Sequence, residues 1–159
     1  MKNIVLHILF IVSLFIGSYS YAKTIIGKPK VIDGDTIHIY KNKIRLHAID
    51  APETNQTCIL NSKKWACGKQ SAKELKKLIS DKSVTCKVNN IDIYYRFIAV
   101  CFIDTIDINQ WMVKNGWAIA YRYYSSDYIF EEKFARKNKL GIWSSLFIEP
   151  YKYRQKNKK

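Results

Sequence analysis

Residues 31–53 decide the fold, and they read VIDGDTIHIYKNKIRLHAIDAPE. Ile37 and Ile39 alternate with polar or aromatic neighbours, which is the period of two expected of a strand with one buried face. A second run rich in apolar and β-branched residues follows after a polar pair. We therefore predict two adjacent strands, at 36–40 and at 43–49.

Similar patterns extend this prediction in both directions. A strand candidate at 24–32 precedes the stretch, and Pro29 inside it predicts an edge position or a break. Further strands are predicted at 83–89 and 96–103, and helices at 69–79, 107–116 and 127–140. Five short strands interrupted by helices predict an α+β protein, namely a five-stranded OB-fold-type β-barrel with three packed α-helices.

Length and charge limit the function classes. The chain has 159 residues, of which 48% are hydrophobic, so it can bury one core and is neither a disordered tail nor a multi-domain enzyme. Lys and Arg number 27 against 13 Asp and Glu, which gives a net charge of +14. This excess predicts a polyanionic partner, either a nucleic acid or an anionic surface.

The first residues resemble a secretory signal. Lys2 precedes the apolar run 8–17, and the small residues Ser20 and Ala22 suit cleavage after residue 22. The alternative is an uncleaved membrane anchor, although the run is shorter than the ~20 residues that a spanning helix needs. We therefore expect a secreted or periplasmic protein that is not stably associated with a membrane. We also expect a monomer, because no feature of the sequence requires a larger assembly. Its parts are a signal at 1–22, one domain at 23–150 and a frayed basic tail at 151–159.

The four cysteines suit two disulfides in an exported protein. Cys58 and Cys67 bracket a short polar loop. Cys86 and Cys101 lie in two strand-like runs on either side of a predicted hairpin turn, so antiparallel pairing would place them opposite each other. Of the three possible pairings, we predict Cys58–Cys67 with Cys86–Cys101. A metal site is disfavoured because the chain has no C-x-x-C spacing.

Acidic residues gather in two short motifs, VIDGDT and IDAPE, which hold Asp33, Asp35, Asp50 and Glu53. Each motif alone would pass for a turn or a loop. Bare carboxylates would repel a polyphosphate, however, and a cation resolves that conflict. Because the motifs offer oxygen ligands and no Cys or His ligand, they favour a hard cation, either Ca²⁺ or Mg²⁺. Gly34 permits a close backbone approach between the first two acids.

Two arginines complete the predicted site. Arg45 lies between Ile44 and Leu46 in a strand, so its side chain projects to the opposite face. Arg96 follows a predicted hairpin turn. A guanidinium group can bind phosphate through two parallel hydrogen bonds. Taken alone, an arginine in this setting would more often be a surface residue.

The ordered motifs VIDGDTIHI, KIRLHAIDAPET, CGKQSAKEL, DIYYRFIAV, WMVKNGWAIAYRYY and EEKFARKNKLGIW resemble the thermonuclease family, the staphylococcal or micrococcal nuclease type. The chain looks most like the secreted bacterial branch with extra cysteines, and the resemblance covers about residues 31–143. It implies the OB-type barrel and a Ca²⁺-dependent endonuclease that cleaves DNA and RNA to leave 3′-phosphates.

The resemblance also implies a role for each matching residue. Asp35 and Asp50 match direct metal ligands, the Ala51 carbonyl matches a backbone ligand, and Asp33 matches an acid that acts through water. Glu53 matches the proposed general base. Arg45 and Arg96 match the two arginines that clamp the phosphate. Tyr94, Tyr121 and Tyr123 match aromatic residues that line the nucleotide pocket.

Some features depart from the family pattern or suit another function. Tyr95 stands where a glycine commonly precedes the second arginine, and a tyrosine tolerates positive φ poorly. The resemblance therefore leaves the turn that presents Arg96 undetermined. Two other classes would explain the charge: a non-catalytic OB-type nucleic-acid-binding protein, and a basic protein that adheres to anionic surfaces. The complete set of acids and arginines favours the enzyme.

Overall fold

The structure is a computed structural model that describes residues 23–157, so the predicted signal segment 1–22 lies outside the described residues. The main sheet has seven strands. They are β1 (Thr24–Gly27), β2 (Pro29–Val31), β3 (Thr36–Ile39), β4 (Asn42–Leu46), β8 (Val84–Ile91), β9 (Phe97–Ile103) and β10 (Ile106–Asp107).

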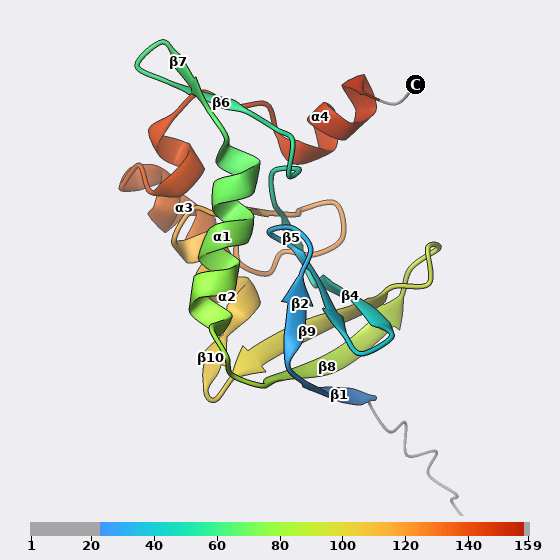
Figure 1. The fold of residues 1–159 in the computed structure, drawn as a ribbon. Helices are drawn as coiled ribbons and strands as arrows, with labels where there is room; N and C mark the ends of the chain where they lie inside the picture. The colour runs from blue at the N-terminus through green and yellow to red at the C-terminus, as the bar shows by residue number, and fades with distance from the viewer. Residues whose placement is uncertain (1–22, 158–159) are drawn as a thin grey trace, which may run out of the picture.

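The main sheet curls into a nearly closed barrel (Figure 1). Its strand order is β1-β8-β9-β4-β3-β2, and β10 adds to β9. The two ends of this path, β1 and β2, are consecutive in the chain and are separated only by Lys28. The break next to Pro29 therefore lets one segment serve both edges, as the sequence predicted. With β1 and β2 counted as one interrupted strand, the main sheet consists of the five predicted strands and the two-residue β10.

The helices lie on one side of the barrel, except for the last (Figure 1). They are α1 (Cys67–Ile79), α2 (Ile108–Lys114), α3 (Ile129–Lys137) and α4 (Pro150–Lys156), with a 3₁₀-helix η1 (Gly141–Ser144). Two small antiparallel sheets pair β5 (Ile49–Asp50) with β11 (Ile119–Ala120), and β6 (Cys58–Leu60) with β7 (Lys63–Trp65). The carboxylate of Asp107 caps α2 by accepting a hydrogen bond from the Gln110 backbone N–H at 2.9 Å.

Apolar side chains from the strands fill the barrel. Ile37 and Ile39 are completely buried, which confirms the alternation expected in β3. Ile44 and Leu46 of β4 are buried beside them, so the intervening Arg45 faces the other way, as predicted. The same packing fixes the strand register, because a shift by one residue would expose every buried isoleucine.

Both predicted disulfides are present. Cys86 and Cys101 are register partners in the antiparallel β8–β9 pair and are bonded to each other. Cys58 of β6 is bonded to Cys67 at the start of α1. This second bridge closes residues 58–67, the part of the connection between β5 and α1 that follows Glu53.

The structure corrects the predicted tail. Residues 150–156 form the helix α4, although five basic residues without an acid had indicated a frayed segment. The helix begins with Pro150, whose fixed φ suits a first helical position. The acids that pair with it, Asp50 and Glu53, lie about 100 residues earlier in the chain. The fold thus has a fourth α-helix in addition to the three predicted.

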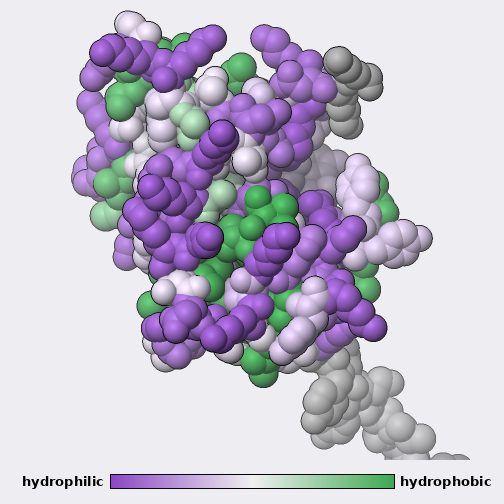
Figure 2. Space-filling view, viewed as in Figure 1, coloured by the Kyte–Doolittle hydropathy of each residue, from purple (hydrophilic) through white to green (hydrophobic). Residues whose placement is uncertain are grey.

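Hydrophilic side chains dominate the face shown in Figure 2, with a small hydrophobic patch among them. Such a surface agrees with the large excess of basic residues. Within residues 23–157, no helix combines the length and the apolar character that crossing a membrane requires.

Candidate functional site

The first two acids lie in the tight connection between β2 and β3. The Asp35 backbone N–H donates to Asp33 Oδ1 at 2.9 Å, which fixes the turn. A Cβ atom on Gly34 would lie only 2.6 Å from the Cβ of Ala51 and would overlap Ser71 of α1. Glycine is therefore required here because the acid-bearing turn packs directly against the β5 segment and α1, as the sequence predicted.

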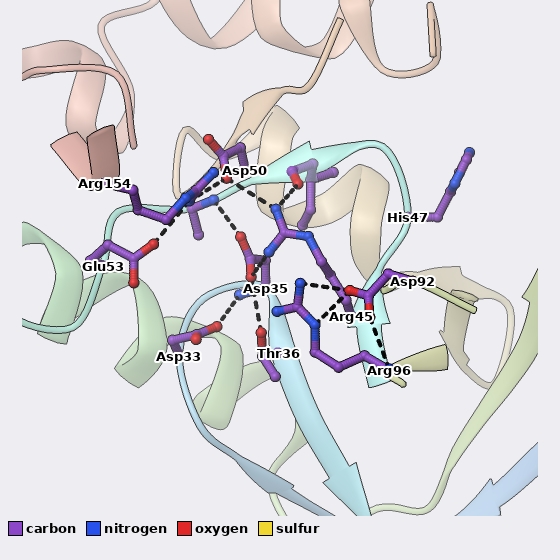
Figure 3. Close-up of polar contacts among 12 residues, drawn as sticks. Asp33, Asp35, Thr36, Arg45, His47, Asp50, Glu53, Asp92, Arg96 and Arg154 are labelled. Atoms are coloured by element: carbon purple, nitrogen blue, oxygen red, sulfur yellow. Dashed lines mark hydrogen bonds and ion pairs between the residues drawn. The ribbon is translucent and has the colours of Figure 1, made fainter. Parts of the chain in front are cut away.

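The second acidic motif meets the first through a backbone hydrogen bond. Asp50 ends β5, where pairing with β11 buries it completely. The next residue, Ala51, donates its N–H to Asp35 Oδ2 at 2.8 Å. Two segments that are 15 residues apart in sequence thus place their carboxylates together at one end of the barrel (Figure 3).

Arg45 joins these two carboxylates. Its Nη1 lies 2.6 Å from Asp35 Oδ1 and its Nη2 lies 3.0 Å from Asp50 Oδ1. Burial alone would lower the pKa of Arg45, but the charges of Asp35 and Asp50 raise it. The guanidinium group therefore stays charged and fixes the spacing of the two proposed metal ligands.

One oxygen of this cluster has no partner. Asp50 Oδ2 is buried and accepts no hydrogen bond from any residue that the structure describes. Burial, followed by the negative charge of Asp35, raises the pKa of Asp50. Burial and the charge of Asp35 likewise raise the pKa of Asp33 to about 7. An unpaired buried carboxylate oxygen is costly, and a bound cation would supply the missing partner.

The oxygen donors of this cluster suit a hard cation, although they do not form a complete, preformed coordination shell. Across residues 23–157, no three His, Cys, Asp or Glu side chains form a ready-made metal cluster. Two carboxylates, a backbone carbonyl and water can nevertheless hold Ca²⁺, which takes 6–8 oxygen ligands and tolerates variable geometry. The unpaired Asp50 Oδ2 beside Asp35 therefore fits such an ion, with water completing its coordination.

Glu53 follows in the loop after β5, and its carboxylate is bound by an arginine that does not belong to the predicted site. Arg154 of α4 places its Nη1 2.8 Å from Asp50 Oδ1 and 2.9 Å from Glu53 Oε1 (Figure 3). Burial alone would lower the pKa of Arg154, whereas its contacts with Asp50 and Glu53 raise it. The only sequence signal for this residue was its place among other basic residues near the C-terminus.

Arg96 presents a different arrangement. It precedes β9, whose Phe97 and Ile98 pair in parallel with Ile44 and Arg45 of β4. Its guanidinium group binds Asp92 in its own turn, with both Nε and Nη2 at 2.7 Å from Asp92 Oδ2. The strand pairing thus brings the two arginines to neighbouring strands, while Arg96 is held by its own acid rather than by the carboxylate cluster.

The turn before Arg96 contains a residue in the left-handed backbone conformation. Tyr95 has a φ of +59°, so it adopts the conformation that a glycine would take more easily. Asp92 holds the turn by accepting the N–H groups of Tyr94 and Arg96 at 2.9 and 3.0 Å. The tyrosine side chain is exposed, so no packing compensates for the strained backbone.

The predicted aromatic residues divide into two places. Tyr121 and Tyr123 belong to a cluster of rings in which Tyr121 also contacts Tyr124 and Tyr151, at centroid distances of 5.2 and 6.2 Å. Tyr121, Tyr123, Tyr151 and Asp50 line a groove of about 470 Å³. Tyr94 instead lies on the β8–β9 turn, where Arg96 is 5.5 Å from its ring centre.

His47 lies at the margin of the site. Its Nε2 is 3.1 Å from Asp127 Oδ2, and Figure 3 places it away from the carboxylates. The nearly closed barrel thus gathers acids and guanidinium groups at one end, an arrangement that can hold a cation and bind a phosphate group.

Comparison with known proteins identifies the family. The family model described as staphylococcal nuclease homologue matches residues 43–145. The micrococcal nuclease of Shigella flexneri is 33% identical over 147 residues, covering 81% of this chain and 79% of that protein. An uncharacterized endonuclease of Haemophilus influenzae is 32% identical over 165 residues, covering 99% and 88%. The chain belongs to the staphylococcal nuclease homologue family.

A third relative has a different description. The succinoglycan biosynthesis protein ExoI of Rhizobium meliloti is 36% identical over 126 residues, covering 77% of this chain and 66% of that protein. The family match begins at residue 43 and ends at residue 145. Asp33 and Asp35 therefore precede the matched segment, and Arg154 follows it.

Proposed function

We propose that this protein is an exported, Ca²⁺-dependent, sugar-non-specific endonuclease that hydrolyses DNA and RNA and leaves 3′-phosphates. The observation that carries the proposal is the unpaired, buried Asp50 Oδ2 within a cluster of carboxylates and arginines. Two disulfides are compatible with an oxidising, secreted or periplasmic location.

The proposed ligands are Asp35 and Asp50 directly, the Ala51 carbonyl, and Asp33 through water. When bound, a divalent cation supplies positive charge at the scissile phosphate and favours ionisation of a nearby water molecule. Arg45 stays ion-paired to Asp35 and Asp50, so its charge lies where a phosphate would enter. The residues thereby convert a repulsive acidic cluster into a binding site for an anion.

Hydrolysis requires a water oxygen to attack phosphorus while the bond to the 5′-oxygen breaks in line. Glu53 takes a proton from that water, the departing 5′-oxygen takes a proton from solvent, and the phosphate stays on the 3′-oxygen. Arg45 and Arg96 donate hydrogen bonds to the phosphate oxygens as negative charge builds in the transition state. For Arg96, this means exchanging its present partner Asp92 for the phosphate.

Substrate binding rests on charge and stacking. The net charge of +14 holds the phosphate backbone without reading its sequence, so binding weakens steeply as salt rises. Tyr121 and Tyr123 stack on bases in the groove beside Asp50, and Tyr94 contacts a nucleotide from the β8–β9 turn. Stacking of this kind favours single-stranded or frayed substrate.

The test is cleavage of plasmid DNA and of single-stranded RNA by the mature protein with Ca²⁺, with Mg²⁺ and with EGTA. We expect cleavage in Ca²⁺, little in EGTA, and recovery when Ca²⁺ is returned. The fragments should resist ligation to a 5′-phosphorylated adapter until a 3′-phosphatase has removed their 3′-phosphates. Full activity in EGTA would refute the metal dependence. Binding without cleavage in Ca²⁺ would indicate the non-catalytic OB-type alternative.

A further inference from the structure

We propose that Arg154 is a positioning residue of the nuclease site, which holds the Glu53 carboxylate beside Asp50. This inference deepens the proposed function and rests on it. Arg154 lies beyond the segment that the family model matches, which ends at residue 145. Neither the motifs nor the family match therefore assigns it a role.

One nitrogen makes both contacts. Nη1 of Arg154 is 2.8 Å from Asp50 Oδ1 and 2.9 Å from Glu53 Oε1. Asp50 is completely buried, whereas the side chain of Glu53 is one-third exposed. Two carboxylates that would otherwise repel each other are thus held on either side of one positive charge. The proposed general base is fixed relative to a proposed metal ligand.

The approach to α4 is tied to the loop that carries Glu53. Gln56 is almost completely buried, and its Oε1 accepts the Glu53 backbone N–H at 3.3 Å. Its Nε2 donates to the Ile148 carbonyl at 2.6 Å, two residues before α4 begins. Ile59 and Leu146 exchange two backbone hydrogen bonds at 2.8 and 2.9 Å. These hydrogen bonds therefore fix the start of α4 relative to the Glu53 loop, and so they fix the position of Arg154 beside Glu53.

Arg154 can stay in place when a cation is bound. It uses Oδ1 of Asp50, as Arg45 does, and leaves Oδ2 free. Four acids, Asp33, Asp35, Asp50 and Glu53, face the two positive charges of Arg45 and Arg154. A divalent ion would balance this set, and without Arg154 the loaded site would stay negative towards an incoming phosphate.

The experiment compares the full chain carrying Arg154→Ala with Lys156→Ala as the matched control. Lys156 lies in the same helix, is exposed and carries the same charge. We expect Arg154→Ala to lower kcat on the order of 10²-fold. Calorimetric titration should give several-fold tighter Ca²⁺ binding, because a positive charge near the ion is lost. Lys156→Ala should match the wild-type protein in both measurements.

Two further measurements separate positioning from a structural role. Arg154→Lys should restore most of kcat, since a single nitrogen makes both contacts and an ammonium group can replace it. Guanidinium ion at low, non-denaturing concentration should partly rescue Arg154→Ala but not Glu53→Gln. Loss of Ca²⁺ affinity together with kcat, without rescue, would assign Arg154 a structural role and overturn the proposal.

Other results would overturn it in different ways. Faster cleavage by Arg154→Ala would show that the contact of Arg154 with Glu53 is inhibitory. Cleavage rates and Ca²⁺ affinities equal to those of Lys156→Ala would show that Arg154 has no role in the site. If the wild-type protein fails to cleave in Ca²⁺, the proposed function fails. The Ca²⁺ titration then still decides whether Arg154 is coupled to the cation site, because unchanged affinity in Arg154→Ala would exclude that coupling.

Discussion

Replacing Gly68 by alanine tests how closely α1 approaches the loop that carries Glu53. A Cβ on Gly68 would lie 2.6 Å from the Glu53 carbonyl carbon and would overlap the carbonyl oxygen, whereas real Cβ contacts stay above 3.0 Å. Because the obstacle is backbone, the loop or the helix must move. Alanine forms helices more favourably than glycine, by up to about 1 kcal/mol. The close contact therefore changes the expected effect on folding stability from a gain to a loss.

Overpacking of this kind costs about 1–3 kcal/mol of folding free energy. A displacement of the catalytic group on the order of 1 Å lowers the rate by ~10²-fold. We therefore expect Gly68→Ala to lower both the urea midpoint, followed by circular dichroism, and kcat, measured on a fluorogenic oligonucleotide with Ca²⁺ under conditions where the protein is fully folded.

Gly27→Ala is the matched control. Its Cβ would also be crowded, at 2.7 Å from Ile39 Cγ2, but it lies in β1 and meets side chains only. This variant should lose stability while keeping its kcat. A Gly68→Ala protein that is as stable and as active as the wild-type protein would refute the inferred contact between α1 and the Glu53 segment.

Three further predictions follow from the structure. Tyr95→Asn should raise the free energy of unfolding by roughly 0.5–1 kcal/mol, because asparagine tolerates the left-handed backbone better; a lower urea midpoint would contradict this. The pKa of Asp33 is raised, above all by burial and then by Asp35, to about 7. Its contribution to stability is therefore present below pH 4 and, without Ca²⁺, is lost as the pH rises through about 7. Urea unfolding in EGTA from pH 4 to 8 should show that decline, and Asp33→Asn should flatten it; in the wild-type protein Ca²⁺ affinity should rise over the same range. Replacing Cys58 and Cys67 by alanine should cost about 2.5 kcal/mol through lost loop constraint and also lower kcat, whereas removing the β8–β9 disulfide should lower stability alone, as paired denaturation and rate measurements can check.

Local patterns were sufficient to predict the barrel and the proximity of the two acidic motifs. The alternation around Ile37 and Ile39 predicted the buried face of β3, and the spacing of Cys86 and Cys101 about a turn predicted their pairing. The clustering of acids predicted that Asp35 and Asp50 belong together, and the structure joins them through Arg45. These features depend on residues close in sequence, whose periodicity fixes which way each side chain points.

Only the tertiary structure decided how α4 is used and how each arginine is paired. The charge pattern of residues 151–159 indicated a frayed segment, because the acids that pair with Arg154 lie about 100 residues away and leave no local signal. Likewise, nothing adjacent to Asp50 in sequence reveals that one of its oxygens is buried without a partner. Sequence determines the strands and the residue types that can do chemistry, whereas burial and charge pairing depend on which distant segments the fold brings together.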